Sequence, residues 1–206
     1  MPLQNRVDPF GLIHAVPNRG LFLGNRGGCF HTPDQKLKST HWKSQQWITC
    51  VLEFKDRRRG LMMPGLYTEL FFLDEATSFA AGHRPCYECR YQEAKQFREA
   101  LMRAGVFHAQ PRAGEISALI TGEIQSVLRG DSERKEIRPA DLPDGAMFSK
   151  DRVAYLKWQD KAYPWSFSGY GASDTLPNAG LRLTPRATCA ALANGYVPAL
   201  HPTLNA

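Results

Sequence analysis

Two cysteines with the spacing of metal ligands stand near the middle of the chain, in the run Pro85-Cys86-Tyr87-Glu88-Cys89. Two thiols three positions apart on a tight turn can hold one ion, because the turn directs both sulfurs inward and the amides at a helix start lower their pKa. A tetrahedral structural zinc site needs two further ligands, which can come from distant segments. We therefore predict that Cys86 and Cys89 bind Zn²⁺.

The remaining ligands of such a site are sought among the other three cysteines. Cys50 lies in an apolar, β-prone segment, and 35 residues separate it from Cys86. Cys29 lies in a glycine-flanked loop with His31, and 20 residues separate Cys29 from Cys50. We predict a structural four-cysteine site, with His31 either replacing one of these ligands or forming a hydrogen bond to a sulfur. Cys189 stands in an alanine-rich helical run and is interpreted as a packing residue.

Other interpretations of these cysteines stay open. The pair at 86 and 89 is also compatible with partly buried thiols, and Cys50 with a small core residue. A thioredoxin-like redox pair is disfavoured because no βαβ frame precedes the motif. A different class of function is a metal-dependent enzyme with three protein ligands and one open coordination position, in which Glu69 or Glu88 would act as the acid-base partner.

The cysteine count and the hydropathy pattern bear on the compartment. Five cysteines are an odd number, and a Cys-x-x-Cys pair in a reducing compartment indicates metal or redox chemistry rather than a disulfide framework. The longest apolar runs are far shorter than the roughly 20 residues that a membrane span needs. The N-terminus has no apolar stretch behind its charge. We expect a cytoplasmic protein that is not inserted in a membrane.

The elements that must position these residues indicate an α+β protein with small mixed or antiparallel sheets and short helices. A buried strand is expected at 47–54, a short helix between the N-cap Asp74 and Gly82, and amphipathic helices at 91–105 and 115–129. The charged segment 131–141 is interpreted as a solvated boundary. Beyond it we expect a β-rich region at 145–170 and a last helix at 185–193, with Thr184 as its N-cap. The predicted domains are a zinc-binding α+β domain at 1–130 and a β-rich subdomain with a terminal helix at 140–206, with a single domain that contains both as the alternative.

The stretch from Phe71 to Arg90, FFLDEATSFAAGHRPCYECR, resembles the metal-binding domain of the bacterial Ada-type DNA methylphosphotriester repair protein. In that family an aromatic strand, a short helix and an Arg-Pro-Cys-x-x-Cys turn supply half of a four-cysteine zinc site. The resemblance implies zinc binding at Cys86, Cys89, Cys29 and Cys50. Two features differ: the family's first two cysteines are close together in sequence, and His83 stands where an aromatic residue is usual. The resemblance does not imply methyl-acceptor activity, because the acceptor belongs to the part of the motif that this chain lacks.

The net charge of +6 permits a polyanionic partner. Between positions 36 and 59 the chain has only two acidic residues and seven basic ones, which are Lys36, Lys38, Lys43, Lys55, Arg57, Arg58 and Arg59. With Trp42, Trp47 and Tyr67 nearby, this stretch has the combination of cations and rings that holds single-stranded nucleic acid. We predict nucleic-acid contacts at Lys55, Arg57, Arg58 and Arg59. A solvated turn beside core aromatics is the alternative.

Several common enzyme classes lack their motifs here. The chain has no G-x-x-x-x-G-K-[ST], no G-x-S-x-G and no H-E-x-x-H sequence, which argues against P-loop nucleotide hydrolases, serine hydrolases and zincin proteases. Pro85-Cys86-x-x-Cys89 occurs in zinc deaminases, but the His-x-Glu that should precede it is missing. The first hypothesis is a zinc-binding protein associated with nucleic acid, and the alternative is the metal-dependent enzyme, acting on a small molecule or on nucleic acid.

Overall fold

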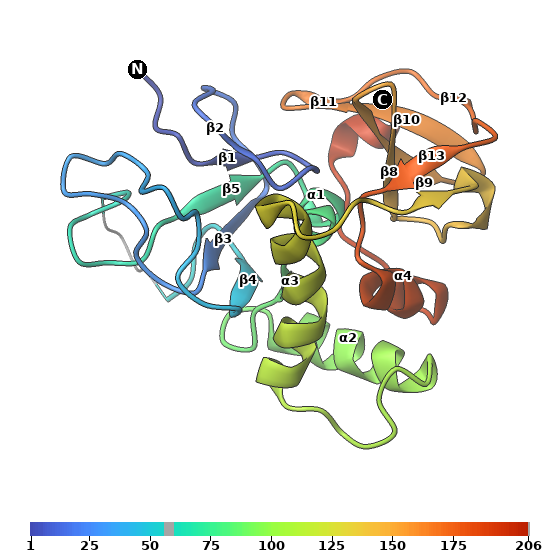
Figure 1. The fold of residues 1–206 in the computed structure, drawn as a ribbon, viewed down its shortest axis with the longest axis horizontal. Helices are drawn as coiled ribbons and strands as arrows, with labels where there is room; N and C mark the ends of the chain where they lie inside the picture. The colour runs from blue at the N-terminus through green and yellow to red at the C-terminus, as the bar shows by residue number, and fades with distance from the viewer. Residues whose placement is uncertain (56–59, 206) are drawn as a thin grey trace.

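Two β-sheets lie on opposite sides of the molecule, with helices between and below them (Figure 1). The computed structural model describes residues 1–55 and 60–205. In these residues the first sheet has the strand order β2-β1-β5-β3-β4-β6 and the second the order β11-β10-β9-β8-β13-β7, with β12 paired to β10. This combination of helices and separate sheets confirms the predicted α+β class.

The first sheet is built from the N-terminal part of the chain. Its strands are β1 Arg6–Val7, β2 Ile13–His14, β3 Phe22–Arg26, β4 Trp47–Cys50, β5 Leu70–Phe72 and β6 Arg84–Pro85. β3 is antiparallel to both of its neighbours, whereas β6 runs parallel to β4. β4 therefore lies inside the sheet, with one antiparallel and one parallel partner.

The second sheet is antiparallel and confirms the β-rich region expected at 145–170. Its strands are β7 Glu136–Ile137, β8 Met147–Lys150, β9 Val153–Trp158, β10 Lys161–Ser166, β11 Gly169–Tyr170, β12 Asp174–Thr175 and β13 Gly180–Arg182. The charged segment 131–141 is more than a solvated connection, because β7 within it pairs with β13.

The helices follow the predicted capping signals with one exception. They are α1 Glu75–Ala80, α2 Tyr91–Arg103, α3 Ala113–Arg129 and α4 Arg186–Ala193, with 3₁₀ turns at Pro139–Asp141 and Pro202–Asn205. Asp74 caps α1 by accepting the Thr77 amide at 2.9 Å. Thr184 does not cap α4; its hydroxyl accepts the Met147 amide at 2.8 Å. No helix in the described part of the chain is long and apolar enough to cross a membrane.

Helix α1 is fully buried and contributes to two hydrophobic clusters. Phe79 packs with Phe97 of α2 and belongs to the same cluster as Phe148 of β8. Ala76 belongs to a second cluster that includes Met147. These clusters combine residues of α1 with residues of the second sheet. The helix that precedes the Cys-x-x-Cys motif and the C-terminal sheet are therefore packed against each other.

Two buried carboxylates at the start of α1 hold the C-terminal segment in place. Asp74 accepts hydrogen bonds from the Tyr170 hydroxyl at 2.7 Å and from the His201 amide at 3.1 Å. Glu75 forms an ion pair with Arg90 at 2.7 Å and accepts the Tyr196 hydroxyl at 2.8 Å. Buried charges need such partners, because an unpaired carboxylate in this position would be costly to desolvate.

The glycine-containing run 24–28 has the composition of a loop, but its first three residues belong to β3. Gly24 lies opposite Thr49 of β4. A Cβ atom there would lie 2.5 Å from the Phe72 ring and 2.6 Å from the Ile48 carbonyl. Gly24 thus serves close packing within the sheet, which a sequence pattern does not distinguish from a loop signal.

Candidate metal centre

The register of two neighbouring strands brings Cys50 and Cys86 together. β4 and β6 run parallel, with Thr49 opposite Pro85. The pairing extends one residue further, because the Cys86 amide donates a hydrogen bond to the Thr49 carbonyl at 3.0 Å. Cys50 and Cys86 therefore leave the sheet side by side at the carboxyl ends of adjacent strands.

Cys89 joins this pair through a tight turn between β6 and α2. The Arg90 amide donates to the Cys86 carbonyl at 3.0 Å, and the Glu88 amide donates to the Cys86 sulfur at 3.3 Å. The Val51 backbone, directly after β4, acts to lower the pKa of the Cys89 thiol. Backbone groups from both segments therefore favour the thiolate form, as expected for a thiolate site.

The sulfur atoms of Cys50, Cys86 and Cys89, here called the Cys50 cluster, all lie within 4.8 Å of one another. Sulfurs around a tetrahedral zinc ion with bonds of ~2.3 Å are about 3.8 Å apart, a separation that this limit includes. Three sulfur donors suit a thiophilic ion and not Mg²⁺ or Ca²⁺, which prefer oxygen. Within residues 1–55 and 60–205 no fourth His, Cys, Asp or Glu joins the group.

The three thiols share their protons. Hydrogen bonds from the Cys50 and Cys89 thiols hold the pKa of Cys86 far below its usual value. The contact with Cys86 is also the largest cause of a raised pKa at Cys50, because the Cys50 proton is shared with a thiolate. A divalent ion in place of these protons would stabilise all three sulfurs as thiolates.

Arg84 is the buried cation beside the Cys50 cluster, with 5% of its surface exposed. Its Nε donates to the Ser117 hydroxyl at 2.9 Å, its Nη1 to the Pro85 carbonyl at 2.9 Å and its Nη2 to the Gln46 amide oxygen at 3.2 Å. Burial lowers the pKa of Arg84, while Tyr87 and the neighbouring cysteines raise it. Three thiolates with one divalent ion would carry a single negative charge, which this guanidinium would balance.

His83 fills the position where the resembled motif has an aromatic residue. Its ring is buried and lies 4.6 Å from the Phe72 ring and 5.1 Å from the Trp47 ring. Burial and the nearby Arg26 cation keep the pKa of His83 well below its usual value. The imidazole is therefore neutral and packs as an aromatic ring.

Cys29, the fourth predicted ligand, is not brought to the Cys50 cluster. β3 and β4 are antiparallel, with Leu23 opposite Cys50 and Arg26 opposite Trp47. Cys29 follows Arg26, so it belongs to the end of this strand pair away from Cys50. The predicted four-cysteine set is thereby reduced to a three-cysteine group in the described structure.

His31, the predicted alternative ligand, has both ring nitrogens in hydrogen bonds. Nε2 lies 3.2 Å from the Met63 carbonyl and Nδ1 2.8 Å from the Thr68 hydroxyl. Because a carbonyl only accepts, Nε2 carries the proton and Nδ1 accepts from Thr68. The Cys29 sulfur lies 3.8 Å from Nδ1. His31 is thus a neighbour of one cysteine sulfur and lies outside the metal-binding group.

The remaining candidates also lie outside the Cys50 cluster. Burial raises the pKa of the Cys189 thiol to about 12, and its sulfur donates to the Thr184 carbonyl at 3.5 Å. These contacts fit the packing role expected for Cys189. Glu69 is buried and accepts the Met62 amide at 2.7 Å, whereas Glu88 is exposed. Neither carboxylate belongs to the metal-binding group.

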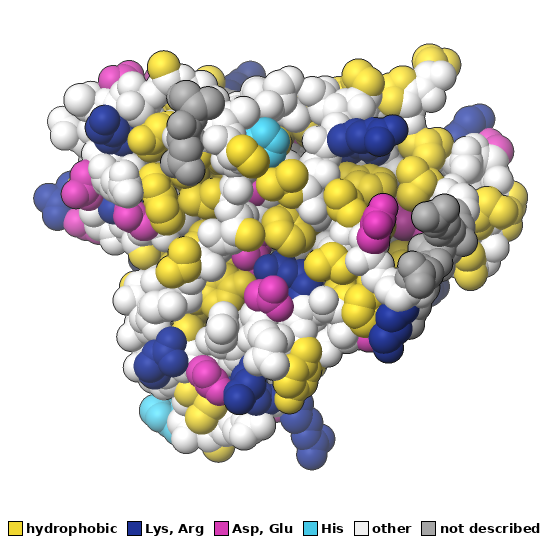
Figure 2. Space-filling view, turned by 180° about the vertical axis from the view of Figure 1, so that it is seen from behind, with side chains coloured by type: hydrophobic (Ala, Val, Ile, Leu, Met, Phe, Trp, Pro, Cys, Tyr) yellow, Lys and Arg dark blue, Asp and Glu magenta, His cyan; other side chains and the backbone are white. Residues whose placement is uncertain are grey.

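The predicted nucleic-acid residues are only partly described. Arg57, Arg58 and Arg59 lie outside the described residues, and Lys55 is exposed with its Nζ 5.0 Å from the Phe54 ring centre. Figure 2 shows Lys and Arg side chains scattered over one face, among hydrophobic, uncharged and acidic groups. On that face the described cations do not form a single continuous patch.

Sequence reasoning missed the role of Arg84. The signal was present, because an arginine stands directly before Pro85 and Cys86. Its partners Ser117 and Gln46 are distant in sequence and carry no motif, so their contribution emerges only from the tertiary fold.

Comparison with known proteins provides no relative for this chain. No protein family, no curated protein and no solved structure matches it. A functional assignment therefore depends on the Cys50 cluster and on the charged and aromatic residues around it.

Proposed function

We propose that this chain is a zinc-binding protein in which Cys50, Cys86 and Cys89 hold the ion and nucleic acid contacts the basic segment that flanks β4. The zinc ion would join the end of β4 to the turn before α2, two segments that 35 residues separate. Structural zinc contributes folding free energy directly, because the site does not exist in the unfolded chain. The ion would act as a structural clamp.

The observation that carries this proposal is the convergence of three sulfurs from two distant segments, all within 4.8 Å of one another. Buried cysteines that serve only packing have no reason to direct their sulfurs to one point. Two backbone groups and the Arg84 guanidinium further favour thiolates at this point. The resemblance of residues 71–90 to the Ada-type metal-binding domain supports the same assignment for Cys86 and Cys89.

Metal analysis combined with X-ray absorption at the zinc edge tests the clamp. We expect about one zinc per chain, bound by three sulfurs and one lighter atom. Cys86→Ser should lose the metal, whereas Cys189→Ala should keep it, since Cys189 packs away from the Cys50 cluster. Four sulfurs around the zinc would indicate that Cys29 is a ligand as well. Wild-type protein that is as stable without metal as with it would refute the proposal.

An open coordination position is the second candidate, and the ligand count favours it. Three protein ligands with one exchangeable position are typical of catalytic zinc, whereas structural sites are closed by four. Addition of imidazole or azide to the cobalt-substituted protein tests this function. A shift in the visible bands would indicate an exchangeable fourth ligand, and an unchanged spectrum would favour the structural clamp.

The exposure of the basic segment supports the contact with nucleic acid. Lys36, Lys38, Lys43 and Lys55 all face solvent. Lys38 and Lys43 form no ion pair among the described residues, so their charges are available to phosphates. Trp42 is half-buried in the same segment and offers a ring for stacking.

Salt dependence of binding tests this interaction. Affinity for a short single-stranded oligonucleotide should fall steeply between about 50 mM and 200 mM salt, because each neutralised phosphate releases counterions. Joint replacement of Arg57, Arg58 and Arg59 by Ala should reduce the logarithmic salt slope by roughly 0.7 to 0.9 for each phosphate that is no longer neutralised, with the zinc content unchanged. Absence of measurable affinity at the lower salt concentration would refute the nucleic-acid function.

A further inference from the structure

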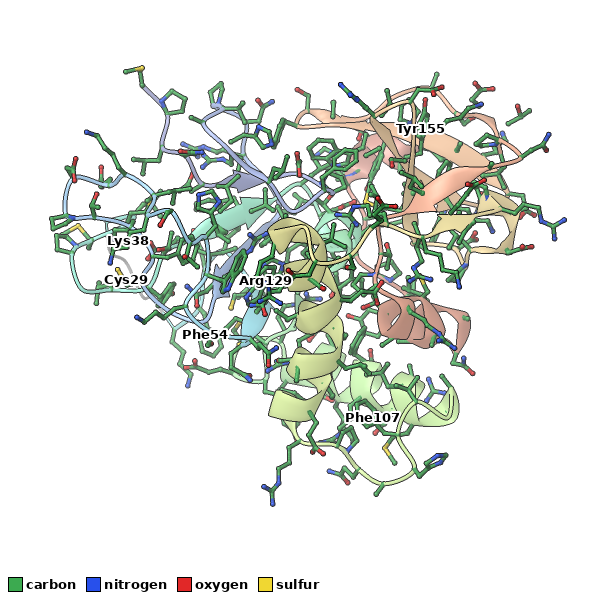
Figure 3. All side chains as sticks on the ribbon, viewed as in Figure 1. Cys29, Lys38, Phe54, Phe107, Arg129 and Tyr155 are labelled. Carbon is green, nitrogen blue, oxygen red and sulfur yellow. The ribbon has the colours of Figure 1, made fainter. Side chains whose placement is uncertain are left out.

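A hollow of about 380 Å³ lies beside Cys29, at the end of the β3–β4 pair away from the Cys50 cluster. We call it the Cys29 hollow. Figure 3 shows Cys29 and Lys38 in the same loop region, apart from Phe54, which follows β4. The side chains that matter for binding are Cys29, Lys38, Ser39, Thr40, Trp42 and Lys43.

Backbone hydrogen bonds hold both ends of the loop that forms this hollow. The Lys38 amide donates to the Phe30 carbonyl at 2.9 Å, and the Lys43 amide donates to the Arg26 carbonyl at 2.9 Å. Gly28 has φ +148°, and a Cβ atom there would lie 3.1 Å from the Lys43 side chain. A glycine at this position thus lets the loop close over the end of β3.

The charge of the hollow selects for an anion. Lys38 and Lys43 line it, and none of the described residues that line it is acidic. The nearby Asp34 is paired with Lys36 at 3.2 Å instead. A larger hollow of about 710 Å³ between α3 and the second sheet lacks this selectivity, because its lining mixes both signs of charge in Glu133, Glu136, Asp151, Arg134, Lys150 and Arg152.

Trp42 gives the same hollow an aromatic wall. Its ring centre lies 5.8 Å from that of Trp47, and Trp47 is fully buried under the Arg26 guanidinium at 4.1 Å. The Trp42 ring is therefore held on one side and is partly exposed beside the two lysines. A planar ligand that stacks here would have its charged group within reach of ammonium and hydroxyl donors.

We propose that the Cys29 hollow binds one nucleotide, with its base on Trp42 and its phosphate between Lys38 and Lys43. Ser39 and Thr40 would add hydroxyl donors to the phosphate. This inference rests on the proposed function, because the hollow would bind one nucleotide of a nucleic-acid strand. A free nucleotide has the same recognition chemistry, so the test separates the two sources.

The Cys29 thiol lines the hollow and reports its occupancy. Alkylation of the zinc-loaded protein by iodoacetamide is followed for each cysteine peptide by mass spectrometry, with the partly buried Cys189, which does not line the hollow, as internal reference. Adenosine monophosphate and a short oligodeoxyadenylate should each slow alkylation of Cys29 several-fold. Adenosine and inorganic phosphate at the same concentration should protect less, because adenosine lacks the phosphate and inorganic phosphate lacks the base.

Variants assign this protection to the two walls. Trp42→Ala should weaken the binding of adenosine monophosphate about tenfold or more, since a stacked base contributes on this scale. The double replacement of Lys38 and Lys43 by Ala should remove protection. Lys36→Ala is the matched control, because this exposed lysine of the same loop pairs with Asp34 and does not line the hollow.

The outcomes separate the hollow from the proposed function. Oligonucleotide binding that leaves Cys29 alkylation unchanged overturns the hollow as the site and leaves nucleic-acid binding intact. Protection by adenosine monophosphate without affinity for the oligonucleotide supports the nucleotide site and overturns the nucleic-acid function. Absence of both effects overturns both proposals. Equal protection by the Trp42→Ala protein overturns the stacking wall.

Discussion

The Cys50 cluster and the Cys29 hollow both contain a cysteine that the sequence marks as a zinc ligand, but the fold builds them differently. The cluster stands at the ends of two paired strands, where strand register fixes the positions of Cys50 and Cys86. Cys29 stands in a loop at the other end of β3, beside His31 and two lysines. Regular backbone pairing thus assembles ligands from distant segments, whereas the loop surrounds its single cysteine with groups suited to an anion.

The largest difference between the two regions should appear on removal of a thiol. Cys86→Ser should remove the zinc and lower the Tm by on the order of 10 °C or more, because structural zinc contributes many kcal/mol to folding. Cys29→Ser should retain about one zinc per chain and nearly the wild-type Tm. Metal content and calorimetry are the measurements. Loss of zinc from the Cys29 variant would show that Cys29 also contributes to the metal site.

Removal of the buried ion pair between Glu75 and Arg90 should have the next largest effect, which is on the stability of the fold. Glu75 and Arg90 are both almost fully buried, and Arg90 directly follows Cys89. Glu75→Gln leaves a buried cation without its carboxylate, at a cost of about 3 to 5 kcal/mol. Urea unfolding should show this loss, while zinc content remains near one per chain. An unchanged unfolding midpoint would contradict the assigned role of the pair.

Acid should affect the cluster through its protons. The Cys50 pKa is raised, so a proton must leave when a metal binds, and falling pH favours the protonated, metal-free form. Zinc affinity should therefore decrease by about tenfold or more for each pH unit, since each displaced proton contributes one factor of ten. Competition with a chromophoric chelator at several pH values measures this slope. A pH-independent affinity would show that thiols are not the ligands.

The smallest effect on stability is expected from removal of the Thr68 hydroxyl, which forms hydrogen bonds with the loop that contains Cys29. Thr68→Val removes a hydroxyl that donates to His31 Nδ1 and accepts the Phe30 amide. Its removal should cost about 1 to 3 kcal/mol, because two buried polar groups lose a partner. Alkylation of Cys29 should become faster while the zinc content stays constant. Release of zinc from this variant would mean that the two regions are coupled.

Local signals in the sequence determined much of the framework. Asp74 at the start of α1, Gly130 at the end of α3 and the three- and four-residue spacing in α2 act through neighbouring backbone, so each is visible within a few residues. The Cys-x-x-Cys turn is local in the same sense. The sequence also predicted that Cys50 lies close to this turn, and the three sulfurs do lie together. That prediction depended on the apolar strand around Cys50 and on its separation from the motif in the sequence.

Only the tertiary structure decided which end of β3 meets the metal motif. The segment containing Gly24 and Cys29 has the composition of a glycine-rich loop, yet Gly24 pairs with Thr49 within the β3–β4 strand pair. Glycine is needed there because the Phe72 ring and the Ile48 carbonyl leave no room for a Cβ atom. The resulting antiparallel register directs Cys29 away from Cys50, and the parallel register of β4 and β6 brings Cys50 to Cys86. A one-dimensional pattern contains cysteine types and spacings, but the direction and register of strand pairing depend on long-range packing.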